Sequence, residues 1–194
     1  MEPDGTLIAK TKVTRVHTGG NTPYEWWNRV NSNYMRVYVP AGSQLVSATG
    51  HTREFPPAPL DYKLLGFQND ATVVQEEEAI RIDEKSGTRV GKEFGKTVFG
   101  NWVYVSPGEE VSVEYVYLLP FRLDPREKEA SAYSLLFQKQ PGVNEVDFRS
   151  KITYPNDWDI HWKSDNELLQ VGESGIQLER TVRSDTFWGV VFDE

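Results

Sequence analysis

Hydrophobic and polar residues alternate along most of the chain. The alternation is clearest in residues 96–105 and 110–119, where valine and aromatic residues recur at every second position. Successive side chains of a strand point to opposite faces, so this period of two predicts β-strands. Pro107 and Gly108 lie between the two segments and are typical of a tight turn. We therefore predict a β-hairpin over this region.

A second pair of alternating segments covers residues 33–39 and 44–49, with Pro40 and Gly42 between them. The same reasoning predicts a second hairpin. Further strands are expected at residues 6–16, 133–138, 145–154, 160–162, 176–182 and 187–192. About ten to twelve short strands separated by turns are the signature of an antiparallel sandwich.

Three segments depart from this pattern. Residues 51–61 contain three prolines, which donate no ladder hydrogen bonds, so we expect a long loop. Residues 75–78 read Gln-Glu-Glu-Glu and are interpreted as the solvated face of an edge strand. Thr22 could cap a short helix with Pro23 at its first position, and a structured aromatic loop is the equal alternative.

Composition supports the same fold class. Val, Ile, Thr, Tyr, Phe and Trp make up 64 of the 194 residues, whereas Ala, the best helix former, occurs only 8 times. We predict an all-β, antiparallel β-sandwich, immunoglobulin-like or jelly-roll-like, with long loops and at most one or two short helices. We expect one domain, residues 1–194, in which a subdivision would fall near residues 124–131.

Charge and cysteine content exclude several functions. The net charge is −8, which argues against nucleic-acid binding. The absence of cysteine rules out disulfides, cysteine-ligated metal sites and thiol nucleophiles, and we expect no cofactor. A cysteine-free chain is compatible with the cytoplasm and equally with an oxidising cell exterior.

Several stretches resemble a known family. Residues 34–43, 95–102 and 107–109 carry recurrent strand-and-turn motifs, and residues 133–142 end in Gln-Lys-Gln-Pro-Gly, the most specific of them. Together they resemble the C-terminal portion of a bacterial family of membrane-anchored proteins catalogued only as a domain of unknown function. The resemblance implies an extracytoplasmic location and a membrane contact made only through a segment outside this chain. It assigns no catalytic residues. Residues 1–5 look like the start of a cloned fragment.

An aromatic segment is the best candidate for binding. Exposed side chains of Tyr24, Trp26 and Trp27 would offer rigid stacking surfaces to a sugar or a partner protein. The neighbouring Trp26 and Trp27 cannot both face the core of an extended segment. The structural alternative is that one of them plugs an end of the sandwich and the other covers it.

A weaker candidate is a metal site. Asp157, Asp159 and His161 lie at every second position, which on a strand places all three on one face. Two carboxylates and an imidazole can bind a divalent metal ion. The alternative is a polar face beside a turn, with the intervening Trp and Ile side chains facing inward.

Acidic residues also leave room for catalysis. A glycosidase needs two carboxyl groups about 5–9 Å apart, one of them with a raised pKa. Glu76, Glu77, Glu78, Asp83 and Glu84 are candidates only because they are acidic.

Three functions therefore follow from the sequence. The first is a non-enzymatic extracytoplasmic module on the bacterial cell surface that binds a protein or a cell-wall polysaccharide. The alternative is a carboxylate-dependent hydrolase acting on envelope glycans. The third is a purely structural spacer.

Overall fold

The computed structural model describes residues 1–53, 60–127, 130–164, 169–172 and 175–193. It is mostly antiparallel β-structure with two short helical segments, which confirms the predicted sandwich-like fold class. The strands are β1 (Thr6–Val16), β2 (Asn31–Pro40), β3 (Gln44–Thr49), β4 (Arg81–Ile82), β5 (Arg89–Glu93), β6 (Lys96–Val105), β7 (Glu110–Arg122), β8 (Ser131–Phe137), β9 (Val146–Ile152), β10 (Asp159–Lys163), β11 (Leu169–Gly172), β12 (Gly175–Val182) and β13 (Thr186–Asp193).

The chain divides into two compact units. One, the central unit, is Ala9–Pro120, and the other, the terminal unit, combines Met1–Ile8 with Phe121–Glu194. The expectation of one domain over residues 1–194 remains a prediction. The subdivision anticipated near residues 124–131 includes residues 128 and 129, which lie outside the described residues.

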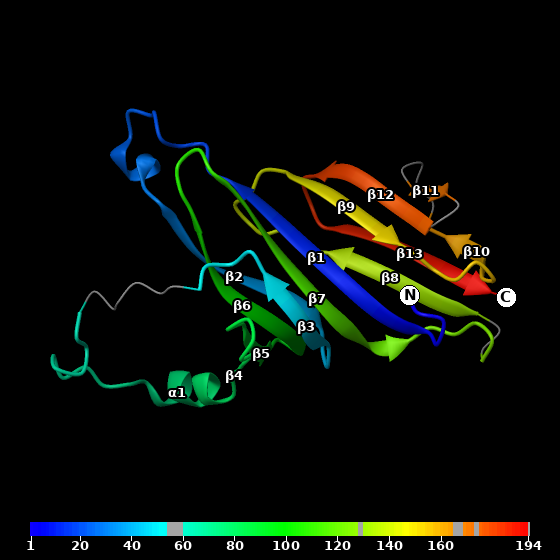
Figure 1. The fold of residues 1–194 in the computed structure, drawn as a ribbon, viewed down its shortest axis with the longest axis horizontal. Helices are drawn as coiled ribbons and strands as arrows, with labels where there is room; N and C mark the ends of the chain where they lie inside the picture. Colours follow the sequence, from blue (N-terminus) through cyan, green and yellow to red (C-terminus); the bar gives the residue numbers. More distant parts are fainter. Residues whose placement is uncertain (54–59, 128–129, 165–168, 173–174, 194) are drawn as a thin grey trace. The chain divides into compact units, whose positions relative to one another are not determined.

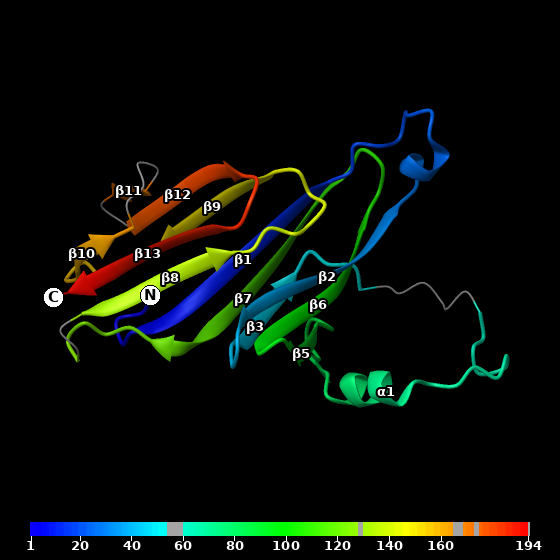
Figure 2. The same ribbon diagram turned by 180° about the vertical axis from the view of Figure 1, so that it is seen from behind.

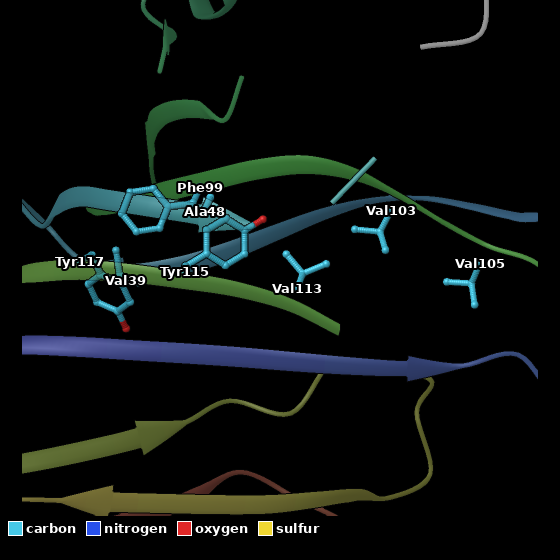
Figure 3. Close-up of a cluster of buried hydrophobic side chains, with 8 residues drawn as sticks. All are labelled: Val39, Ala48, Phe99, Val103, Val105, Val113, Tyr115 and Tyr117. Carbon is cyan, nitrogen blue, oxygen red and sulfur yellow. The ribbon is translucent and has the colours of Figure 1, made fainter. Parts of the chain in front are cut away.

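The central unit contains two sheets, of order β1-β7-β3 and β2-β6-β5-β4. In both ribbon views β6 lies beside β2, and β7 lies beside β3 (Figure 1, Figure 2). The core cluster draws side chains from strands of both sheets (Figure 3). Its buried members are Val39, Ala48, Phe99, Val103, Val105, Val113, Tyr115 and Tyr117. Phe99 of β6 stacks on Tyr115 of β7 with ring centroids 5.9 Å apart.

Both predicted hairpins are wrong in their pairing. The strands form where the alternation predicts them, but β2 pairs with β6 and β3 pairs with β7. The turns after β2 and after β6 therefore carry the chain from one sheet to the other. The physical reason is that a Pro-Gly turn reverses the chain without deciding whether the two strands share a ladder or face each other across the core. The alternation is the same in both cases.

The terminal unit also contains two sheets, of order β10-β13-β8 and β11-β12-β9. Strand β12 pairs with β9, and β13 pairs with β8, all antiparallel. Trp188 and Phe192 of β13 are fully buried. The centroid of the Phe192 ring lies 5.6 Å from that of Trp158 and 4.8 Å from that of Tyr154. Buried aliphatic side chains, among them Ile176, Leu178 and Val190, complete this core around the rings.

The acidic segment is a helix, which corrects the edge-strand interpretation. Helix α1 spans Ala71–Glu78, and none of its residues is buried. Asp70 caps it, because its Oδ1 accepts hydrogen bonds from the backbone N–H groups of Thr72 (2.8 Å) and Val73 (3.1 Å). In the predicted loop over residues 51–61, residues 54–59 lie outside the described part of the chain. No helix of the described residues has the length and apolar character needed to cross a membrane.

Candidate functional site

The segment between β1 and β2, residues 17–30, forms a loop that we call the aromatic loop. Its first residue is tied to the turn between β6 and β7: the His17 N–H donates to the Glu109 carbonyl (2.9 Å), and the Gly108 N–H donates to the His17 carbonyl (2.8 Å). The two segments lie beside each other in both ribbon views (Figure 1, Figure 2). The loop therefore starts from a fixed point at one end of the central unit.

Four rings form a continuous cluster in this loop. Tyr24 lies 6.2 Å from Trp26, Trp26 lies 5.4 Å from Trp27, and Trp27 lies 5.7 Å from His17, measured between ring centroids. Trp26 and Trp27 meet edge to face, as do Trp27 and His17, which is a favourable geometry for aromatic pairs. Trp26 is 69 % exposed and Tyr24 is 59 % exposed, so most of their surface faces solvent.

The imidazole of His17 lies beneath this cluster and is held by two hydrogen bonds. Its Nδ1 accepts from the Gly19 N–H (3.0 Å), and its Nε2 lies 2.9 Å from the Arg29 carbonyl oxygen. Because a carbonyl oxygen only accepts, Nε2 carries the proton and the ring is held as the neutral tautomer. This ring links the start of the aromatic loop to its end.

Glycine 19 is required by close packing. A Cβ atom at this position would lie 2.0 Å from the Trp27 carbonyl oxygen and 2.7 Å from the His17 ring. Neither neighbour can be displaced without moving the ring cluster. Only glycine allows the backbone at residue 19 to approach Trp27 and His17 this closely.

The side chain of Asn28 holds the middle of the loop. Its Oδ1 accepts hydrogen bonds from the Gly20 N–H (2.8 Å), the Thr22 N–H (3.2 Å) and the Thr22 hydroxyl (3.0 Å). Its Nδ2 donates to the Thr22 carbonyl (2.7 Å). One carboxamide thereby satisfies four groups of the loop backbone and side chains, which fixes the segment that carries Tyr24 and Trp26.

A small cleft lies beside the rings. It has a volume of about 180 Å³ and is lined in part by Arg15, His17, Trp26, Trp27, Arg29 and Asn31. Arg15 is half-buried, and its Nη2 donates to Asn31 Oδ1 (3.1 Å). Its Nη1 is shielded from solvent and has no hydrogen-bond partner. Two cationic side chains thus border the exposed indole rings.

The structure brings the three predicted aromatic residues together. Residues 25–28 form a 3₁₀ turn (Glu25–Asn28), so the segment is not extended and both tryptophans reach solvent. The plug-and-cover alternative does not describe Trp26, and Trp27 is covered in part by His17. Thr22 does not cap the turn; Tyr24 occupies the cap position, and Thr22 bonds to Asn28.

Sequence reasoning missed the residues that support the rings. Asn28, His17 and the two arginines of the cleft carry no motif, because their partners are backbone groups brought close only by the fold. The one available signal is the glycine pair before the aromatic segment, which indicates a tight turn.

The structure does not bring the predicted metal ligands together. Asp157 lies in the turn before β10, and β10 has a bulge between Ile160 and Trp162, which breaks the alternation on which the prediction depends. The His161 Nδ1 instead lies 2.9 Å from Asp193 Oδ2 of β13. Within the described residues, no group of three or more His, Asp or Glu side chains could hold a metal ion.

Trp162 next to this bulge also departs from expectation. It is 51 % exposed, whereas Trp158 is buried, so only one of these indoles faces the core. The bulge accounts for the difference, because it rotates the side chains that follow it.

The acidic candidates for catalysis are dispersed. Glu76, Glu77 and Glu78 lie on the exposed helix α1. The Ser86 hydroxyl and backbone N–H both donate to Asp83 Oδ2, at 2.6 and 2.9 Å. These hydrogen bonds lower the pKa of the Asp83 carboxyl group, which is the direction opposite to the one a general acid needs.

Comparisons with models of protein families, with curated proteins and with solved structures find no match to this chain.

Proposed function

We propose that this chain is a non-enzymatic recognition module that binds a polysaccharide through the aromatic loop. The observation that carries the proposal is the exposed ring cluster of Tyr24, Trp26 and Trp27, held in place by Asn28. The faces of sugar rings carry C–H groups that pack well against indole and phenol rings. The polar groups of the neighbouring cleft would bond the hydroxyl groups at the sugar's edge.

Exposure supports a binding role over a structural one. An indole that is 69 % exposed contributes little to the burial that stabilises a fold, so Trp26 adds little to the stability of the central unit. By contrast, Trp188 is fully buried in the terminal unit and serves its core. The difference separates an aromatic residue that packs from one that remains available to a ligand.

Rigidity supports the same role. Binding costs free energy when it immobilises side chains and loops, and a loop already fixed by hydrogen bonds avoids part of this cost. The Asn28 hydrogen bonds and the Gly19 contact hold the aromatic loop before any ligand arrives.

The dimensions favour a glycan over a protein partner. A stable protein interface buries about 800 Å² on each partner, around a central apolar region. The aromatic cluster is bordered by the exposed polar residues Thr18 and Glu25 and by the exposed Val16 and Val30. Its cleft of about 180 Å³ is smaller than the ~300–1,000 Å³ typical of enclosed ligand sites. One sugar unit of a longer chain, lying across the surface, fits this size.

The proposed location is the outer face of a bacterial envelope. It rests on the family resemblance of residues 34–43, 95–102 and 133–142. A polysaccharide of the cell wall is the abundant ligand at that location.

The test is sedimentation of the protein with purified, protease-treated bacterial cell walls, together with titration of tryptophan fluorescence by chitotetraose. We expect Trp26→Ala to weaken binding at least about tenfold without lowering the melting temperature. Trp162→Ala is the matched control, because it removes a half-exposed indole outside the aromatic loop. Equal effects of the two substitutions, or binding that disappears after protease treatment of the walls, would refute the proposal.

A further inference from the structure

The cleft beside the ring cluster carries positive charge without a counter-charge. Arg15 and Arg29 both line it, and no carboxylate does. Among the described residues, neither guanidinium group takes part in an ion pair. The nearby Glu109 carboxylate accepts from the Ser106 N–H (2.8 Å) in the turn that supports the loop. No ion pair within the described part of the chain therefore neutralises the two arginines.

Arg15 is the more informative of the two. Its side chain is half-buried, one nitrogen bonds to Asn31, and Nη1 is shielded from water with no partner. A buried donor without an acceptor destabilises the folded state, and does so more strongly when it is charged. No hydrogen bond within the described residues offsets this loss of stability. Arg15 also lines the cleft, so an anion bound there would lie beside its side chain, and hydrogen bonds between charged groups are roughly twice as strong as neutral ones.

We propose that the polysaccharide bound by this loop is anionic, and that Arg15 and Arg29 bind its carboxylate or phosphate groups while a sugar ring packs on Trp26. This inference rests on the proposed function and specifies its ligand. Carboxylates and phosphates share the property that matters here, because both present two oxygen atoms that match the planar donors of a guanidinium group.

The net charge of the chain limits where this attraction acts. At −8, the protein as a whole repels a polyanion, so the two arginines do not steer the ligand from a distance. They act at contact, inside a Debye length of about 8–10 Å. Binding is therefore expected to be selective for the anionic group and only moderately weakened by salt.

The test compares matched probes. Oligogalacturonate carries a carboxylate on each sugar, and its methyl ester presents the same sugars without charge; glucose 6-phosphate and glucose form the equivalent pair for phosphate. We expect the charged member of at least one pair to bind about tenfold more tightly than its neutral partner. Arg15→Gln and Arg29→Gln should remove this preference while leaving the melting temperature near that of the parent. Arg180→Gln removes the same charge from an exposed position on β12 and is the control.

The outcomes separate this inference from the proposed function. Equal affinity for charged and neutral probes, with both lost in Trp26→Ala, would overturn the inference and leave glycan binding standing. A preference that disappears in Arg15→Gln but is unchanged in Trp26→Ala would support the anion site and refute sugar stacking. If none of the four probes binds, the inference fails, and binding to cell walls and to chitotetraose decides the proposed function separately. If Arg15→Gln unfolds the protein, Arg29→Gln, which alters an exposed side chain, decides the matter alone.

Discussion

The phenol of Tyr115 donates a hydrogen bond of 2.9 Å to Asn101 Oδ1 across the core of the central unit. Tyr115 lies on β7 and Asn101 on β6, so the bond joins the two sheets. Tyr115 is fully buried and Asn101 is 5 % exposed. Burial raises the pKa of the Tyr115 phenol, which keeps it protonated and able to donate. The pair thus adds one specific polar contact to the apolar packing between the sheets.

Replacing Tyr115 by Phe should destabilise the central unit by about 1–3 kcal/mol, because the buried Asn101 oxygen loses its donor. Urea unfolding followed by circular dichroism measures the change. The double variant Tyr115→Phe with Asn101→Leu removes both polar partners and should recover part of the loss. A single variant as stable as the parent would show that the bond contributes nothing.

Acid should weaken the β4–β5 hairpin through Asp83. The Ser86 hydrogen bonds lower the pKa of this carboxyl group below its ordinary value of 3.8. The unfolded chain therefore binds the proton more readily, and the stabilisation is complete above the unfolded pKa and lost as pH falls through the folded one. The stability difference between the parent and Asp83→Asn should shrink as pH falls from 6 to about 2.5.

Glu84→Gln provides the charge-matched control for that titration, because Glu84 is exposed and makes no hydrogen bond to Ser86. Denaturation curves at several pH values give the comparison. A difference between the parent and Asp83→Asn that stays constant with pH would contradict the assignment.

Phe94 should be replaceable with a gain in stability. It is 91 % exposed and has a φ of +50°, at the first position of the two-residue turn between β5 and β6. A left-handed conformation costs most residues about 1–2 kcal/mol, whereas Asn adopts it more readily. We expect Phe94→Asn to raise the free energy of unfolding by about 1 kcal/mol. Phe94→Ala removes the ring but keeps the strained conformation, so it should not share the gain.

Loss of the Asn28 side chain should loosen the aromatic loop without unfolding the central unit. In Asn28→Ala the backbone N–H groups of Gly20 and Thr22 lose their acceptor. We expect faster hydrogen exchange at these two amides and weaker glycan binding, with a melting temperature close to that of the parent. Asn28→Asp keeps the acceptor oxygen and should show a smaller effect. Unchanged exchange in Asn28→Ala would mean that the loop is held by other contacts.

The sequence predicted the strands better than their partners. Residues 96–105 and 110–119 are strands as expected, because alternation reports which side chains face the core. It does not report which strand lies alongside, and hairpins were therefore predicted where the chain crosses between sheets. Helix α1 was missed because Val73 and Val74 favour strands, whereas the cap at Asp70 and the glutamates that follow favour a helix.

In the candidate site, too, the sequence identified some residues and missed others. Tyr24, Trp26 and Trp27 could be identified from the sequence, since adjacent tryptophans cannot both be buried in an extended segment. The contacts of Asn28, Arg15 and His17 could not, because they depend on distances between segments that only the fold brings together. The bulge in β10, which separates His161 from the predicted acidic partners, likewise has no signature in the sequence.

The crossing turns also determine the order in which the protein can assemble. Strand β2 cannot form its ladder with β6 until β6 has been synthesised, since Asn31 pairs with Val105 and Pro40 pairs with Lys96. A nascent chain that has released only β2 and β3 presents two strands with no ladder partner. Contacts so distant in sequence slow folding, and unpaired strands are prone to aggregate. The growing central unit therefore exposes unpaired strand edges until β6 and β7 have both emerged.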